Sequence, residues 1–169
     1  MSAITTPPLP QHSLLARYAG NGGYTDCYAT DLPGSFSQAE FVAAFYTTRL
    51  FKLERTVLKW LVAKPSTDDE AKELAQGGRR SFAAWTVEDR APNQLLLRDV
   101  LGNTRSWLMV EPRDDGGVTR LYFGSAVVAR TADDGHPRLG FSFRALLGFH
   151  RRYSRALLAA ARTRLTTTA

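Results

Sequence analysis

The residues best suited to chemistry are His150 and Ser154, on the last predicted helix. They are four positions apart, so their side chains would be neighbours on the helix surface. Both fall within the apolar side of that helix. One interpretation is a core histidine satisfied by a neighbour, with Ser154 bonded back to its own helix. The other is a helix that roofs a cavity, with both polar groups directed into it.

A carboxylate beside His150 would make it a reasonable general base, and Asp99 is our candidate for that role. Whether the two meet depends on the strand register. The dipeptide Gly102-Asn103 predicts a two-residue hairpin loop. A slip of one residue would reverse every side-chain direction. The predicted pairs are Leu101–Thr104, Asp99–Ser106 and Leu97–Leu108.

This register directs one mostly apolar strand face toward the last helix, with a few polar groups on it. Such a surface is typical of a small-molecule site, and equally of an ordinary core with a hydrogen-bonded cluster. Trp85 and Tyr122 could line the cavity or the outer sheet face. Trp107 is predicted to face outward, as part of an exposed patch that could form a homodimer contact. The cavity candidates are Leu97, Asp99, Ser106, Leu108, Phe123, Ser125, Leu147, His150 and Ser154.

The helix that carries His150 is predicted over Phe141–Leu165 and has two sides. Its apolar residues recur at steps of three and four, and burying five of them is worth on the order of 10 kcal/mol before entropy is counted. Its arginine stripe lies roughly opposite. The apolar set is Phe143, Leu146, Leu147, Leu157, Leu158, Ala161 and Leu165, and the arginine stripe is Arg144, Arg151, Arg155 and Arg162.

The elements before this helix predict an α+β domain. Tyr24–Thr30 has the residue types of a strand. Ser37 with Glu40, and Thr67 with Glu70, have the spacing of capping boxes for two helices. An amphipathic segment, Leu50–Val62, lies between them. Four antiparallel strands follow over 81–89, 94–100, 104–111 and 119–130, which suggests a curved sheet around the last helix.

Composition narrows the class of protein. The length of 169 residues fits one domain at 24–169, after a segment at 1–23 that we expect to be mobile and without regular structure because proline and glycine are dense there. No signal peptide or membrane span is evident, and one cysteine, Cys27, fits a reducing cytoplasm. The net charge of +6 comes entirely from the six arginines after residue 140, because acidic and basic side chains balance in the rest of the chain. No metal, phosphate-loop or dinucleotide motif is present, so we expect no cofactor.

The stretches TRSWLMVE, TRLYFGSAVV and LLGFHRRYSRALL, with this order of elements, resemble the START-like superfamily, also called polyketide-cyclase-like or helix-grip domains. They are similar to a bacterial branch known as a domain of unknown function. The resemblance covers roughly Tyr24 to Leu165. It implies a cavity between helix and sheet for an apolar or aromatic ligand. No functional residues are common to the superfamily, so it assigns none here.

Three functions remain open on this basis. The first is a domain that binds or carries a small apolar or aromatic molecule without chemistry. The second is a small cofactor-free enzyme, such as a cyclase, dehydratase or hydrolase, with His150 as general base together with Asp99 or Ser154. The third is an interaction module that uses the arginine stripe on an acidic partner, a membrane or nucleic acid. The wide apolar side of the helix favours burial over nucleic-acid binding.

Overall fold

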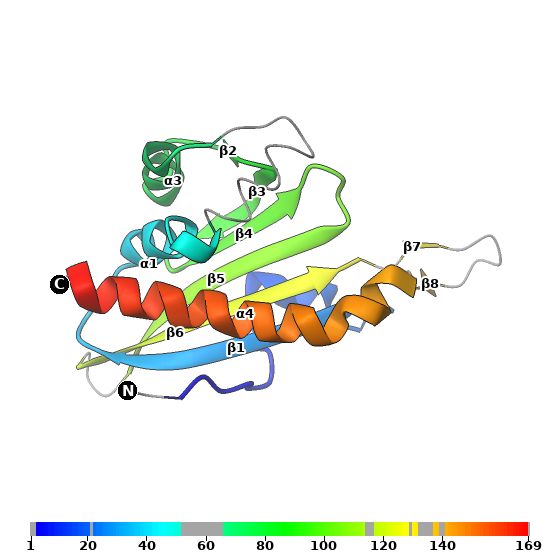
Figure 1. The fold of residues 1–169 in the computed structure, drawn as a ribbon, viewed down its shortest axis with the longest axis horizontal. Coiled ribbons are helices and arrows are strands. Elements are labelled where there is room, and N and C mark those ends of the chain that lie inside the picture. The colour runs from blue at the N-terminus through cyan, green and yellow to red at the C-terminus, as the bar shows by residue number, and fades with distance from the viewer. Residues whose placement is uncertain are drawn as a thin grey trace.

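The computed structural model describes residues 3–20, 22–51, 66–113, 117–128, 130–131, 137–138 and 141–168. It has an α+β fold of the helix-grip type, in which a long C-terminal helix lies across a six-stranded antiparallel sheet (Figure 1). The elements are η1 (Leu14–Tyr18), β1 (Tyr24–Pro33), α1 (Gln38–Tyr46), α3 (Asp68–Ala75), β2 (Ser81–Phe82), β3 (Trp85–Ala91), β4 (Gln94–Asp99), β5 (Thr104–Arg113), β6 (Val118–Val127), β7 (Arg130–Thr131), β8 (Pro137–Arg138) and α4 (Phe141–Thr168).

The two short helices begin at the predicted capping boxes. The Ser37 hydroxyl accepts a hydrogen bond from the backbone N–H of Glu40, and Glu40 accepts one from the N–H of Ser37. Thr67 and Glu70 make the same reciprocal pair at the start of α3. Each box satisfies two backbone donors that a helix N-terminus leaves unpaired. The predicted segment Leu50–Val62 is helical at its first two residues, and the rest of it lies outside the described residues.

The large sheet has the strand order β1-β6-β5-β4-β3-β2, so the first strand pairs with the last long one. The predicted four-strand run is present, but its first strand is divided into β2 and β3. Ala83 has a positive φ of 51° and turns the chain between them. In β3 the register shifts between Val87 and Asp89, which leaves Glu88 as an inserted residue.

The predicted register between β4 and β5 is wrong by two residues. Leu97 pairs with Ser106 and Leu95 with Leu108, where the two-residue loop had predicted Asp99–Ser106 and Leu97–Leu108. The loop is longer because the Asp99 carboxylate accepts hydrogen bonds from the backbone N–H groups of Asn103 and Thr104, at 2.7 and 3.2 Å. An even shift preserves side-chain direction, so the inner and outer faces are as predicted.

The inner face of the sheet and the helices enclose the main core. Leu95, Leu97 and Leu108 lie in it, together with Leu157 and Leu158 of α4. Ala161 and Leu165 of the predicted apolar side are also buried there. The side chains of Phe143, Leu146 and Arg144, which belong to the predicted stripes, lie outside the described residues. In Figure 1 α1 and α3 lie on the same side of the sheet as α4.

The outer face of the sheet is covered by the N-terminal segment, which contains η1. The prediction that Trp107 forms an exposed patch is therefore wrong: it faces outward but is 0% exposed, because Leu15 packs beside it. Gly124 makes room for this contact, since a Cβ there would lie 2.8 Å from Leu15 and 2.9 Å from Trp107. Residues 1–23 also contain a helix, η1, where no regular element was expected. A homodimer remains a prediction, without Trp107 as its contact.

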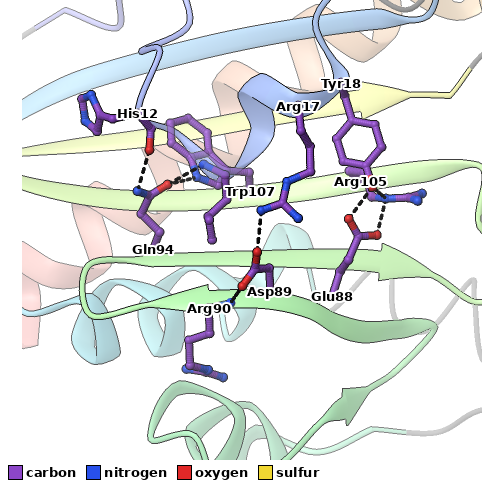
Figure 2. Close-up of polar contacts among 10 residues, drawn as sticks. His12, Arg17, Tyr18, Glu88, Asp89, Arg90, Gln94, Arg105 and Trp107 are labelled. Carbon is purple, nitrogen blue, oxygen red and sulfur yellow. Dashed lines mark hydrogen bonds and ion pairs between the residues drawn. The ribbon is translucent and has the colours of Figure 1, made fainter.

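Polar contacts fasten this N-terminal segment to the sheet, as Figure 2 shows. The Gln94 amide donates to the carbonyl of His12 and accepts from the backbone N–H of Leu14 and from the Trp107 indole N–H. Farther along, the inserted Glu88 binds both the Tyr18 hydroxyl and Arg105. A segment rich in proline is thus held in place by side chains of three different strands, β3, β4 and β5.

Candidate functional site

A cavity of about 330 Å³ lies between the sheet and α4. That volume is at the small end of the range for ligand pockets. Side chains of α1, β5, β6 and α4 form most of its wall. The lining residues are Phe45, Phe51, Trp85, Thr104, Arg105, Ser106, Phe123, Ser125, Ala126, Val127, Phe149, His150, Tyr153, Ser154 and Leu157.

Six of the fifteen lining residues are Phe, Trp or Tyr. Phe45 lies 4.8 Å from Phe123 and 6.4 Å from Phe51 between ring centroids, so these three rings form one contiguous apolar surface. Phe149 and Tyr153, one turn apart on α4, are stacked at 5.9 Å. Phe149 is 68% exposed, which is unusual for a large apolar side chain. It therefore marks the side of the cavity that opens to solvent.

Five of the nine predicted cavity residues line this cavity. Leu97 and Leu108 are instead fully buried in the core. Leu147 is half-buried and is not among the lining residues of the described chain. Of the aromatic residues left open by the sequence, Trp85 lines the cavity, and Tyr122 belongs to the outer cluster with Trp107. The five that line it are Ser106, Phe123, Ser125, His150 and Ser154.

The predicted pairing of His150 with Asp99 is wrong. Asp99 uses its carboxylate to accept from the backbone of its own loop, and it does not line the cavity. The carboxylate beside His150 is Asp26 of β1, whose Oδ2 is 3.1 Å from His150 Nε2. Asp26 and Ser125 are paired across β1 and β6, which places both beneath α4.

Asp26 is the acceptor for a converging set of donors. Its Oδ1 accepts from the backbone N–H and hydroxyl of Ser125, at 2.9 and 2.7 Å. Its Oδ2 accepts from the hydroxyls of Tyr24 and Tyr28 and from His150. The side chain is only 5% exposed. A buried carboxylate with five donors is satisfied in its ionised form.

The balance of these effects sets the charge of Asp26. Burial by itself would raise the pKa of Asp26, but the hydrogen bonds from His150 and Ser125 outweigh it and lower the pKa below its ordinary value of 3.8. The pKa of Tyr28 is raised above its ordinary value, mainly because the side chain is buried and next because the negative charge of Asp26 is close to it. Asp26 is therefore a carboxylate, and the tyrosines are neutral donors, at neutral pH.

Hydrogen positions follow from this charge. An ionised carboxylate only accepts, so His150 Nε2 must carry a proton. Ser125 Oγ, 2.7 Å from Asp26 Oδ1 and 2.9 Å from His150 Nε2, must likewise donate to Asp26. Nε2 cannot then take a proton from Ser125, so the three residues are not a nucleophile–base–acid triad. In a neutral His150 the basic lone pair is on Nδ1.

Two further polar groups belong to the cavity wall. The Trp85 indole N–H is buried and has no hydrogen-bond partner among the described residues. An unpaired buried donor costs about 1–3 kcal/mol, so a ligand acceptor placed there would recover that cost. Ser106, in contrast, shares a hydrogen bond of 3.1 Å with the Tyr46 hydroxyl. The wall thus combines an aromatic surface with one unsatisfied donor.

Asp26 was missed in the sequence, although a signal was present. Within YTDCYAT, an aspartate interrupts a run of strand-forming residues, and aspartate is depleted in strands. The alternation of the strand puts Asp26 on one face with Tyr24 and Tyr28. Their joint position beneath α4 depends on β1 pairing with β6, far away in the sequence, which no local pattern specifies.

Three members of the arginine stripe, Arg151, Arg155 and Arg162, contact β1 or the N-terminal segment. Arg162 donates to the Thr30 hydroxyl at 3.1 Å, and Arg155 donates to Thr6 at 2.9 Å.

Among the described residues, no group of three or more His, Cys, Asp or Glu side chains could hold a metal ion. No helix within the described ranges combines the length and apolar character needed to cross a membrane.

Comparisons with known proteins identify no family. No protein-family model matches the chain, and no curated protein matches it. Among solved structures, the crystal structure of CalU16 from Micromonospora echinospora is similar over 99% of this chain and 94% of its own, with 13% identity and a TM-score of 0.31. Likeness at that level assigns no function to this chain.

Proposed function

We propose that this protein binds or carries a small apolar or aromatic molecule in the cavity between the sheet and α4. The observation that carries the proposal is the cavity itself: about 330 Å³ of space between the sheet and α4, with six Phe, Trp or Tyr side chains in its wall. Close packing is the norm in protein interiors, so a cavity of this size is a specific feature.

The chemistry of the wall favours a flat, mainly apolar ligand with one hydrogen-bond acceptor. Phe45, Phe51 and Phe123 offer ring faces and edges for stacking. The Trp85 indole N–H offers an unpaired donor. Phe149 and Tyr153 stand at the open side, where they could shield a bound molecule from water.

We also propose that the chain is a member of the START-like superfamily. The support is the order of elements: a first strand, short helices, an antiparallel sheet and a long C-terminal helix on that sheet. The same proposal includes membership of the bacterial branch to which the sequence is similar and a location in the cytoplasm. The single, buried thiol of Cys27, whose pKa burial raises to about 12, is compatible with a reducing compartment.

Native mass spectrometry tests the binding proposal when the protein is purified without detergent. We expect a co-purifying small molecule that organic extraction removes. Thr104 lines the cavity, so the indole of Thr104→Trp should fill part of it. Because the indole and a bound molecule would compete for the same space, the fraction of protein with ligand should fall by about tenfold. Leu101→Trp adds the same indole on a loop residue that is 76% exposed and should retain the ligand.

Equal ligand occupancy in Thr104→Trp and Leu101→Trp would place the bound molecule elsewhere on the chain. Circular dichroism and thermal unfolding of both variants separate a filled cavity from a fold that has been lost. A mass equal to the bare chain in every sample would shift the test to added ligands of known structure.

A cofactor-free enzyme is the second candidate, and one observation favours it. The Asp26 carboxylate fixes His150 through Nε2, an arrangement that orients a histidine for proton transfer by its other nitrogen. In this account Asp26 takes the place that the sequence had given to Asp99. His150→Ala should then bind the ligand but lose its turnover by about 10²–10⁴-fold in a product assay. Unchanged turnover would leave His150 a structural residue.

A further inference from the structure

A second hollow, of about 550 Å³, is lined in part by Asp26. Its walls are the N-terminal segment at Pro7 and Pro8, strand β1, and α4. Asp26 belongs to the lining of this hollow, while its partners His150 and Ser125 line the cavity. The two spaces share no lining residue, so the proposed apolar site does not include the second one.

Two guanidinium groups face this hollow from one side of α4. Arg151 and Arg155 are four residues apart, so they are neighbours on the helix. Arg151 Nε is 3.4 Å from the Tyr24 hydroxyl, and Arg155 Nη2 donates to Thr6 Oγ1 at 2.9 Å. Arg155 also lies over the Tyr28 ring, 5.8 Å from its centroid. These contacts hold both side chains in place and use few of their five donors each.

No carboxylate of the described residues is within ion-pair distance of Arg151 or Arg155. The acid that lines the hollow is Asp26, and five donors already surround it. From residue 147 to 168, α4 carries five arginines and no acid. The hollow is therefore positively charged and has unused donors.

The edge of β1 adds backbone donors to the same wall. Ala29 pairs with Thr5 through both its N–H and its C=O, so these groups point away from β6. The antiparallel ladder alternates, so the N–H of Cys27 is directed to that edge too. Cys27 is part of the lining of the hollow. A backbone N–H and two guanidinium groups are the donors that oxyanions prefer.

We propose that this hollow binds the oxyanion group of a small molecule, a phosphate or a carboxylate, between Arg151 and Arg155. The guanidinium forks match both groups in geometry, and the volume exceeds what a bare phosphate needs, so the remainder would hold the body of the ligand. Pro7 and Pro8 supply a rigid apolar wall for that body. The bound anion would also join the N-terminal segment to α4.

Isothermal titration with inorganic phosphate at low ionic strength tests the proposal, because salt screens exposed charges. We expect saturable binding with a Kd of the order of 1 mM, and at least about tenfold weaker binding in Arg155→Gln. Arg152→Gln is the matched control: Arg152 is exposed on the same helix, does not line the hollow, and carries the same charge. It should change the Kd by less than about twofold.

Absence of saturable binding up to about 20 mM phosphate and acetate, or equal losses in Arg155→Gln and Arg152→Gln, would overturn the proposal. Arg151→Gln provides a second variant if Arg155→Gln unfolds. Tighter binding of phosphate than of acetate identifies a phosphate-bearing ligand, and the reverse order identifies a carboxylate. Occupancy of the apolar cavity should be the same in all three variants, so this result and that of the binding proposal are independent.

Discussion

Asp26 concentrates the polar chemistry of this protein in one buried carboxylate. Two tyrosines, one serine and one histidine donate to it, and they come from β1, β6 and α4. The cluster therefore joins the edge strand to the helix that covers the sheet. It also sets the orientation of His150 at the cavity wall. The identity of this one side chain should influence both stability and the geometry of the site.

Asp26→Asn should lower the free energy of unfolding by about 2–4 kcal/mol at neutral pH. An asparagine amide would present N–H groups to donors that now face a carboxylate, and buried donors would lose their acceptor. Urea denaturation at pH 7 measures the difference. Asp69→Asn is the control, because the Asp69 side chain is 87% exposed, and it should change stability by less than about 0.5 kcal/mol.

The pH dependence of this difference has a definite sign. The pKa of Asp26 is lowered by folding, so the unfolded chain binds more protons near that pKa and stability rises with pH. The contribution of Asp26 is fully present above its unfolded pKa of about 3.9 and is lost as the pH falls through its lower folded pKa. The difference in free energy of unfolding between wild type and Asp26→Asn should therefore become smaller below about pH 4. A difference that becomes larger below that pH would contradict a pKa of Asp26 that is lowered by folding.

At the scale of elements, the N-terminal segment forms a second layer on the sheet. Leu15 fills the outer face against Trp107 and Gly124, and Gln94 holds the backbone just before it, at His12 and Leu14. This explains why β4 has three consecutive buried leucines, at 95–97, where a one-sided sheet would show alternation. The continuous apolar run was the sequence signal that both faces are covered.

Leu15→Ala should cost about 2–4 kcal/mol, because Leu15 is fully buried and its removal leaves a cavity. It should also loosen the segment over Trp107. Hydrogen exchange of the Trp107 indole N–H, which donates to Gln94 at 2.9 Å, reports that loosening by NMR and should be faster by about tenfold or more. Leu101→Ala is the exposed control. Unchanged exchange in Leu15→Ala would mean that Trp107 is protected by another part of the fold.

Local signals in the sequence predicted the elements well, and the pairing between distant elements poorly. Capping boxes at Ser37 and Thr67 depend on residues three positions apart, and both predictions are confirmed. The partner of His150 depends on β1, 124 residues away, and Asp99 was the wrong choice. The β4–β5 faces were correct although the register was not, because the error was an even number of residues.

At the scale of the whole molecule, α4 separates two different environments. On one side lies the aromatic cavity with the unpaired Trp85 indole N–H, and on the other lies the hollow that Arg151 and Arg155 line. His150 lines the first, and its hydrogen-bond partner Asp26 lines the second. The fold thus places a largely apolar cavity and a cationic hollow along different faces of one helix, which the order of elements alone does not reveal.

We propose that the cavity between the sheet and α4 binds a small apolar or aromatic molecule. Amide chemical shifts of the isotope-labelled protein, followed by NMR during titration with indole, naphthalene and larger neutral aromatic compounds, test it most directly. We predict saturable shifts centred on Ser106, Ser125, His150 and Ser154, and none around Trp107 on the outer face. Shifts that do not saturate for any compound, or that centre on the outer face, would contradict the claim.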